Sequence, residues 1–256
     1  ALLIALCGIC GATGFILGRA SACQAAYERQ LAEDRLQGRV LDLDGTLVDS
    51  VYVHTLAWRA AFRDVGLEVA AHRLHRLIGM GGDRLVAAAA GDAAEHAVGD
   101  QVRDLHKAHL DELFGHVTAA DGAVELLVSL RDHGLKVVLA SSGDSADTDR
   151  LLDLLGEGRA VLDSVITGSQ AERSKPDGEL LEIALDAVDA ETAVVVGDAV
   201  WDVQAAHDAG VACIGVLTGG FSEAELRDAG ARDVVTSARE LAERLEAGGN
   251  LLPEDR

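Results

Sequence analysis

An alternation of short apolar runs with amphipathic helical segments, from residue 119 to residue 247, limits the possible folds more than any other feature of the chain. Strands that are separated by helices pair in parallel, and such a sheet carries helices on both faces. The sequence therefore predicts an α/β fold, a Rossmann-like doubly wound parallel sheet. The predicted strands, all rich in Val, Ile or Leu, are 136–140, 164–166, 193–197, 211–216 and 233–235, and the clearest helices are 123–133, 179–188 and 200–209.

Another short strand is predicted at residues 39–44, and it leads into the most distinctive segment of the chain, residues 42–50, Asp-Leu-Asp-Gly-Thr-Leu-Val-Asp-Ser. Alternate residues of a strand point to the same side, so Asp42 and Asp44 can reach one pocket where the strand ends. Two carboxylates this close repel each other, and a divalent cation is their natural companion. The segment therefore predicts a metal-dependent site.

The sequence between residues 51 and 118 contains no convincing strand. Residues 51–65 have helical spacing, with His54, Trp58 and Phe62 at four-residue steps along one face. A second helix is predicted to begin at Leu74 and to end in the glycine-rich loop 79–82. Alanine-rich helical segments follow, up to about residue 116. The chain thus predicts an all-helical insert after the first strand.

Further reactive side chains come from segments that lie far from the first strand in the sequence. Ser141 and Asp198 each follow a predicted strand, and Lys175 precedes one of the two prolines of the chain. The carboxyl ends of parallel strands meet at one edge of a sheet, which is where ligands bind. We therefore expect these groups to converge on Asp42 and Asp44. A cation, a lysine and a hydroxyl group around carboxylates suit phosphoryl transfer.

These segments resemble, in chain order, the four motifs of the haloacid dehalogenase superfamily, which consists mostly of Mg²⁺-dependent phosphatases. The similarity is to the phosphoglycolate phosphatase and β-phosphoglucomutase-like subgroup, which has a helical cap. It extends over residues 39–245 and implies a catalytic core at 39–52 and 119–247, with the cap at 53–118. The motifs are Asp-x-Asp-Gly-Thr at 42–46, Ser141, Lys175-Pro176, and Gly-Asp-x-x-x-Asp at 197–202.

The resemblance implies a role for each acidic residue. Asp42 would be the nucleophile that forms an aspartyl-phosphate, and Asp44 would act first as general acid and then as general base. Mg²⁺ is the implied cofactor, with Asp42, Asp198 and the backbone carbonyl of Asp44 as ligands. Asp202 would help to hold the metal directly or through water. Alternatively, Asp202 is simply an acid at a helix N-terminus, where the helix dipole favours it.

The remaining candidates would bind the phosphoryl group. The resemblance implies this role for Lys175 and Ser141, with help from Thr46, and Ser142 is the alternative if the strand ends one residue later. Lys175 is also counted among the catalytic residues. His54 lies twelve residues after Asp42 and resembles the hinge region of the mutases. For His54 a binding role and an ordinary place on a half-buried helix face both stay open, and the other histidines are expected at the surface.

The resemblance implies hydrolysis of a small phosphorylated metabolite, either phosphoglycolate-like or a sugar phosphate. The main alternative is a phosphosugar mutase of the β-phosphoglucomutase type. Two differences favour the hydrolase: Gly197 replaces a glutamate of the mutases, which leaves room beside Asp198, and no arginine stands at Gly82. The alternative from another class, a catalytically silent binding protein, would need a broken motif, and none is found.

The composition of the chain limits which binding partners are expected. A net charge of −21, with no basic cluster to offset it, disfavours nucleic acids and acidic membrane surfaces. Small molecules and cations are the expected partners of a monomer or homodimer. Of the four cysteines, only Cys213 lies outside the first 23 residues. This distribution does not make a disulfide framework, so the catalytic part is expected to be a reduced, cytoplasmic protein.

Residues 1–38 have no clear role in this scheme. Residues 1–18 carry no charge, and they are barely long enough for a membrane helix. They also resemble the apolar part of a signal peptide, but no basic region precedes them. An anchored or exported protein is therefore kept as the alternative to a cytoplasmic one. Cys7 and Cys10 have the spacing of a redox or metal pair, without a second pair, and residues 19–38 predict a polar helix.

Overall fold

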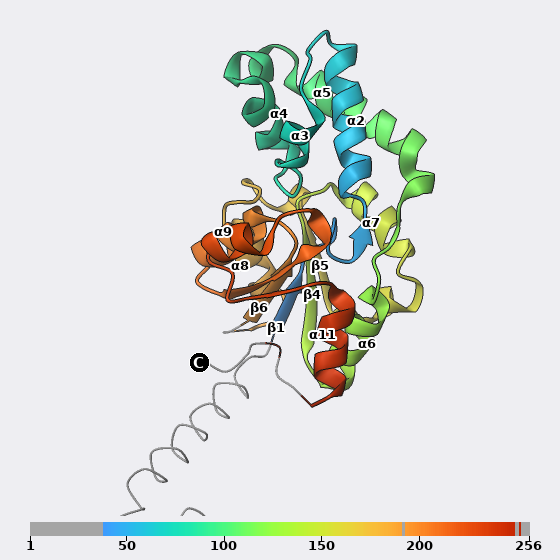
Figure 1. Ribbon diagram of the computed structural model, residues 1–256, viewed down its shortest axis with the longest axis vertical. Helices are drawn as coiled ribbons and strands as arrows, with labels where there is room; N and C mark the ends of the chain where they lie inside the picture. The colour runs from blue at the N-terminus through green and yellow to red at the C-terminus, as the bar shows by residue number, and fades with distance from the viewer. Residues whose placement is uncertain (1–37, 191–192, 249–250, 252–256) are drawn as a thin grey trace, which may run out of the picture. The chain divides into compact units, whose positions relative to one another are not determined.

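A six-stranded parallel sheet organises the part of the chain that the computed structural model describes, residues 38–190, 193–248 and 251. The strand order is β5-β4-β1-β6-β7-β8, so β1 lies between β4 and β6. The predicted doubly wound parallel sheet is confirmed (Figure 1). The strands are β1 (Gly38–Leu41), β4 (Lys136–Ser141), β5 (Ser164–Thr167), β6 (Ala193–Gly197), β7 (Ala212–Val216) and β8 (Asp233–Val235).

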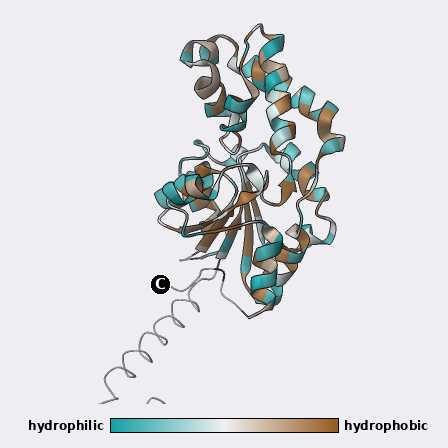
Figure 2. Ribbon diagram, viewed as in Figure 1, coloured by the Kyte–Doolittle hydropathy of each residue, from teal (hydrophilic) through white to brown (hydrophobic). Residues whose placement is uncertain are grey.

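Helices cover both faces of the sheet. In Figure 1, α8 (Glu179–Asp186) and α9 (Val200–Asp208) lie on one face, and α6 (Ala123–Asp132) and α11 (Ala238–Glu246) lie on the other. The strands are apolar along almost their whole length, because a sheet covered on both faces exposes neither set of side chains (Figure 2). The segments between β4 and β8 also form α7 (Ser145–Asp153), α10 (Glu223–Asp228) and the 3-10 helices η2 (Gly156–Val161), η3 (Gly168–Gln170) and η4 (Leu217–Gly219).

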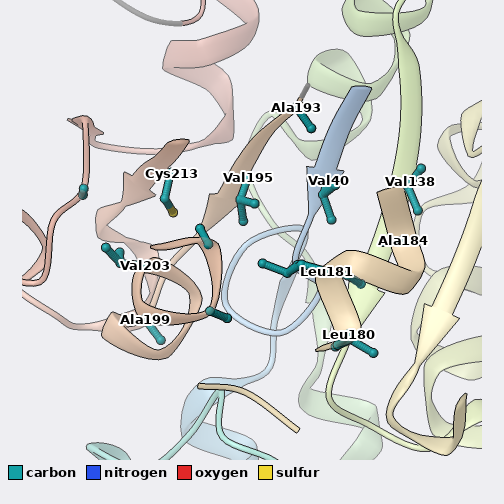
Figure 3. Close-up of a cluster of buried hydrophobic side chains, with 14 of the residues drawn as sticks. Val40, Val138, Leu180, Leu181, Ala184, Ala193, Val195, Ala199, Val203 and Cys213 are labelled. Atoms are coloured by element: carbon teal, nitrogen blue, oxygen red, sulfur yellow. The ribbon is translucent and has the colours of Figure 1, made fainter. Parts of the chain in front are cut away.

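The core under α8 and α9 explains how the site is held in place. Val40, Val138 and Val195 come from three neighbouring strands, and Leu180 and Leu181 of α8 pack against them (Figure 3). All five side chains are at most 1% exposed. Removing a buried leucine from such a core costs about 2–5 kcal/mol, so the strand ends that carry the reactive groups are firmly placed.

A helical insert, defined here as Val51–His116, lies in the sequence between β1 and the other strands of the sheet. Its helices are α2 (Val51–Asp64), α3 (Ala71–His75), α4 (Gly82–Ala90), α5 (Asp92–Leu113) and the 3-10 helix η1 (Phe114–His116). They enclose a core of their own, around Trp58, Phe62, Leu74 and Leu85. The predicted helix that begins at Leu74 was misplaced, because α3 ends one residue later, at His75. The predicted glycine-rich loop lies directly before α4.

A small antiparallel pair of strands stands where the chain enters and leaves the insert. β2 (Val48–Asp49) pairs with β3 (Thr118–Ala119), so that Val48 lies opposite Ala119. The sequence did not predict this pair, because two residues are too few to show a strand period. It brings the two ends of the insert together beside the segment that follows Asp44.

No helix among the described residues is long and apolar enough to cross a membrane. The predictions for residues 1–37, which include the uncharged segment 1–18, the polar helix and the Cys7–Cys10 pair, lie outside the described residues.

Candidate active site

The site begins where β1 and β6 end side by side. Leu41 pairs with Val196, and the Asp42 N–H donates to the Val196 carbonyl at 2.9 Å. Asp42 and Asp198 therefore leave neighbouring strands at the same edge of the sheet. Both are almost completely buried, at 4% and 3% exposure. The predicted convergence at the carboxyl edge is present for these two acids.

Lys175 joins this pair from a separate loop. Its side chain is 1% exposed, so Lys175 is not a surface lysine. The Nζ atom donates to Asp42 Oδ1 at 2.5 Å and to the Ala140 carbonyl at 2.9 Å, and it lies 2.7 Å from Asp202 Oδ1. Burial lowers the pKa of Lys175, but the charges of Asp202 and Asp42 outweigh burial and raise it overall. The lysine is thus a fixed cation between two buried carboxylates.

Asp42, Asp198 and Asp202 have the geometry of a cation site. One carboxylate oxygen from each lies within 4.8 Å of the other two, and all three residues are buried. Asp42 Oδ2 is buried and accepts no hydrogen bond from the described residues. Thr46 Oγ1 donates to Asp198 Oδ1 at 3.2 Å and holds that carboxylate. Carboxylate oxygens are the donors that Mg²⁺ prefers, so the residues present fit this ion.

Without a cation, burial and mutual repulsion disfavour the ionised form of these carboxyl groups. Burial raises the pKa of Asp42 to about 7; Lys175 opposes this rise, and the carboxylates of Asp202 and Asp44 add to it. Burial, with the charges of Asp202 and Asp42, likewise raises the pKa of Asp198 well above its usual range. A bound divalent cation would supply the charge that a proton otherwise supplies.

Three glycines leave the space that these acids occupy. A Cβ atom on Gly45 would stand 2.3 Å from Asp198 Oδ2, and one on Gly219 would stand 1.7 Å from it. A Cβ atom on Gly197 would stand 2.3 Å from Asp202 Cγ. The expectation that Gly197 leaves open room is therefore wrong, since the Asp202 side chain fills that room.

Asp202 serves two purposes at once. It is fully buried, its Oδ2 accepts the Ala199 N–H at 3.0 Å, and its Oδ1 pairs with Lys175. The first contact is that of an acid at the N-terminus of α9, which was the alternative considered above. The second contact turns its other oxygen toward the buried lysine. Asp202 is therefore both a helix-terminal acid and a member of the acidic cluster.

Asp44 lies beside the cluster, and its side chain makes different contacts. Ser50 Oγ donates to Asp44 Oδ1 at 2.5 Å, and His54 Nε2 lies 3.0 Å from the same oxygen. Burial raises the pKa of Asp44, but the charge and hydrogen bond of His54, with help from Ser50 and Lys175, outweigh burial and lower it. Burial lowers the pKa of His54, and Asp44 outweighs that effect and raises it. His54 is thus a partner of Asp44.

His106 is a site residue that the sequence analysis missed. Its Nε2 lies 3.1 Å from His54 Nδ1, and its ring stacks on Trp58 with centroids 3.9 Å apart. Burial and the charge of His54 hold the pKa of His106 well below its usual range. It was expected at the surface, because no spacing rule connects a histidine of α5 with one of α2.

The two serines at the end of β4 differ in their surroundings. Ser141 is 1% exposed, and its Oγ accepts the Gly143 N–H at 3.1 Å. Ser142 is half-buried, donates to the Gly79 carbonyl of the insert at 3.3 Å, and lines a cavity. This cavity has a volume of about 460 Å³ and lies next to Asp44, between the strand ends and the insert.

Comparison with known proteins places the chain in a family. Residues 38–210 match the model of the haloacid dehalogenase-like hydrolases. Validoxylamine A 7'-phosphate phosphatase of Streptomyces hygroscopicus subsp. limoneus is 30% identical over 72% of this chain and 87% of its own. Phosphoglycolate phosphatase of Rhodospirillum rubrum is 29% identical over 83% of this chain and 93% of its own.

Solved structures agree with this placement. A hydrolase from Pseudomonas syringae has a TM-score of 0.78 and 30% sequence identity, and the match covers 84% of this chain and 100% of that one. A β-phosphoglucomutase from Clostridium difficile has a TM-score of 0.67 and 19% identity, over 83% and 98% of the two chains, and shares the fold. The chain belongs to the haloacid dehalogenase-like hydrolase family, as its four motifs predicted, and it is an enzyme of the hydrolase class.

Proposed function

We propose that this protein is a Mg²⁺-dependent phosphatase that hydrolyses a phosphomonoester through a phosphorylated Asp42. One observation carries the proposal: the buried Asp42 is held at Oδ1 by Lys175, while its Oδ2 accepts no hydrogen bond within the described residues. A carboxylate that is fixed through one oxygen keeps the other as a nucleophile. The names of two curated relatives, which are phosphatases, support the same reaction class.

In the first step, Asp42 Oδ2 attacks phosphorus, and the bond from phosphorus to the leaving oxygen breaks. The leaving oxygen takes a proton from Asp44. In the second step, a water oxygen attacks phosphorus, the bond to Asp42 breaks, and Asp44 accepts the proton of the water. Asp44 is ionised at neutral pH, so the first proton comes to it from His54, at 3.0 Å, and returns there afterwards.

Positive charge around the phosphoryl group comes from two sources. Lys175 offers a fixed cation next to Asp42. Asp42, Asp198 and Asp202 would hold Mg²⁺, with the backbone carbonyl of Asp44 as a further ligand; when bound, the ion neutralises charge on the phosphoryl oxygens. Thr46 keeps Asp198 in place, and the Ser141 hydroxyl group and nearby amides would bind phosphoryl oxygens.

Residues 53–118, which include most of the helical insert, are proposed to form the cap, and residues 39–52 and 119–247 are proposed to form the core. Contacts between the two parts support this role. Ser174 Oγ donates to Asp83 Oδ1 at 2.5 Å, and His75 Nε2 lies 2.9 Å from the Gly219 carbonyl. A cap over the site excludes water from the reaction and selects the leaving group.

The substrate is proposed to be a small phosphorylated metabolite. Two relatives are named for different phosphorylated small molecules, phosphoglycolate and validoxylamine A 7'-phosphate. The catalytic part is proposed to work in the cytoplasm, which the free, buried thiol of Cys213 supports.

The test uses 4-nitrophenyl phosphate, whose good leaving group places little demand on the insert. The protein with Mg²⁺ should release phosphate, and a chelator should stop the release. Asp42→Asn should lose at least about 100-fold in kcat, because removal of a covalent nucleophile costs several orders of magnitude. Circular dichroism should show an unchanged fold, since the amide has the shape of the acid. Residual turnover above about 1% would point to another nucleophile.

The mutase alternative has a separate test. Incubation with β-glucose 1-phosphate and its 1,6-bisphosphate should give free phosphate at most, with little glucose 6-phosphate. No arginine stands at Gly82 in the sequence, but the fold brings one there from α5. Arg103 Nη1 donates to the Gly82 carbonyl at 3.1 Å. That arginine is bound to Glu95 and Asp100 rather than free for a second phosphate. Fast isomerisation that depends on the bisphosphate would overturn the hydrolase assignment.

A further inference from the structure

The cavity beside Asp44 is the place where the leaving group of a bound phosphomonoester would lie, so its lining bears on the substrate class. Its volume of about 460 Å³ is in the range of sites for small organic ligands. A two-carbon acid such as glycolate would fill only a small part of this space. Most of the lining residues have polar side chains, and the carboxylic acids among them are Asp44, Asp83, Asp104, Asp144, Asp147 and Glu172.

The two fixed cations of the lining are already paired with acids of the protein. Arg103 makes two hydrogen bonds to the Glu95 carboxylate, at 2.8 and 3.0 Å, and a third to Asp100 at 2.8 Å. Lys107 Nζ donates to Asp144 Oδ2 at 2.8 Å. The positive charge of each side chain is therefore already offset by at least one acid of the protein before a substrate binds.

The histidines of the lining do not change this balance. His54 is paired with Asp44, which the reaction itself uses. The His106 ring stacks on Trp58 and lies near the His54 ring, and burial and the charge of His54 hold the pKa of His106 well below its usual range. Neither ring offers an uncommitted positive charge to an acidic leaving group.

Several hydrogen-bond acceptors, by contrast, are available. Among the described residues, Asp104 and Glu172 form no ion pair, and Asp147 has only Arg150 at 3.8 Å. Asp147 is also partly buried, with a side chain that is 16% exposed. Carboxylates accept hydrogen bonds from hydroxyl and ammonium groups, and they repel another carboxylate.

We propose that this cavity selects a hydroxyl-rich leaving group without a carboxylate, as in a sugar phosphate or an amino-sugar phosphate. The inference rests on the proposed function and narrows it, since it disfavours phosphoglycolate as the substrate. The hydroxyl groups would donate to the unpaired carboxylates, and an amine would gain from the negative lining.

The first experiment compares four substrates with the full chain and Mg²⁺: 4-nitrophenyl phosphate, 2-phosphoglycolate, glucose 6-phosphate and glucosamine 6-phosphate. We expect kcat/KM for both sugar phosphates to exceed that for 2-phosphoglycolate by at least about tenfold, because a site rejects a ligand that leaves charges unpaired. Equal or better use of 2-phosphoglycolate overturns the inference but leaves the phosphatase standing. No hydrolysis of 4-nitrophenyl phosphate overturns the proposed function, and the inference with it.

The second experiment reverses one charge of the lining. Asp104→Lys places an unpaired cation in the cavity, so kcat/KM should rise about fivefold or more for 2-phosphoglycolate and fall for glucosamine 6-phosphate. Glu243→Lys, an equivalent charge change at an exposed position of α11 outside the cavity, is the matched control. Equal effects of the two variants on the ratio of the substrates would overturn the role of the cavity.

Discussion

Asp42 and Asp44 stand two residues apart, yet their surroundings shift their pKa values in opposite directions. Burial raises the pKa of Asp42 to about 7, against the opposing charge of Lys175 and with help from neighbouring carboxylates. Asp44 accepts from Ser50 and lies against His54, and its pKa is lowered. A pair of acids with pKa values moved in opposite directions suits a division of work between a nucleophile and a proton-transfer group.

This division predicts the behaviour of Asp44→Asn. The amide cannot carry the proton, so kcat with 4-nitrophenyl phosphate should fall by about 100-fold or more, since general acid–base catalysis contributes about 10²–10⁴-fold. The affinity for Mg²⁺ should stay within about threefold, because the Asp44 side chain is outside the acidic cluster. Isothermal titration of Mg²⁺ into the variant checks the second point. A lost Mg²⁺ site together with fast turnover would assign Asp44 to the metal instead.

At the scale of the element, the loop that follows β7 closes the site from one side. The turn η4 (Leu217–Gly219) brings Gly219 against Asp198, and Thr218 Oγ1 donates to the Gly45 carbonyl. Backbone therefore packs on the carboxylate with no space for a side chain. The geometry of the proposed cation site should therefore depend on this loop as well as on the acids.

Gly219→Ala should accordingly damage the cation site. The new Cβ would stand 1.7 Å from Asp198 Oδ2, so either the carboxylate or the loop must move. We expect a loss of about 1–3 kcal/mol in the free energy of unfolding, as in other overpacked sites, and at least about tenfold weaker Mg²⁺ binding. Urea unfolding and Mg²⁺ titration measure the two effects. Gly115→Ala is the control, since a Cβ there meets nothing within 4 Å, and comparable losses in both variants would contradict the steric argument.

The strands and most helices were predictable, and the reason lies in local sequence. Residues 136–141 and 193–197 are continuous apolar runs because both faces of a parallel sheet are covered. β2 and β3 were not predictable, since two residues carry no period. The turn after α3 was not predictable either, because neither Leu74 nor His75 carries a helix stop signal and the chain continues through turns to the glycine-rich loop.

For the whole molecule, the buried acids link stability to pH, and the proposed cation site would extend that link to Mg²⁺. The folded pKa of Asp42, about 7, lies above its ordinary value of 3.8, and that of Asp198 is raised too. The folded state thus binds protons more tightly, so the stability from these groups is present at low pH and is lost as the pH rises toward 7. Mg²⁺ replaces the protons and should therefore stabilise the protein more at pH 8 than at pH 5.

Thermal unfolding at both pH values, with Mg²⁺ or with chelator, checks this link. At about 100 times its Kd, Mg²⁺ should raise Tm at pH 8 by roughly 5–10 °C for a chain of this size, and by clearly less at pH 5. Asp198→Asn should lose most of the increment, and its chelated form serves as the control for a general stability change. An equal rise at the two pH values would contradict the assignment of the acids.

Residues 37–256 should fold and act without residues 1–36. Among the described residues, those that form the site all lie downstream of Gly38, and residues 1–36 and 37–256 separate into different units. The truncated protein should keep kcat with 4-nitrophenyl phosphate within about twofold and show the same Mg²⁺ dependence, because no site group is removed. Gel filtration and the activity assay measure this. An insoluble or inactive product would show that the first 36 residues complete the fold.

The sequence by itself determined the sheet, its helices and the acids and lysine at its edge. Continuous apolar runs force buried parallel strands, and Asp42, Asp44 and Asp198 follow those runs closely in the sequence. Lys175 lies in a separate loop and was found through its place before Pro176. Contacts between distant segments were decided only by the tertiary structure. Packing of α5 on α2 brings His106 to His54, fifty-two positions away, and the fold of the insert places Arg103 beside Gly82. Such contacts depend on how elements pack against one another, and no local spacing in the chain encodes that.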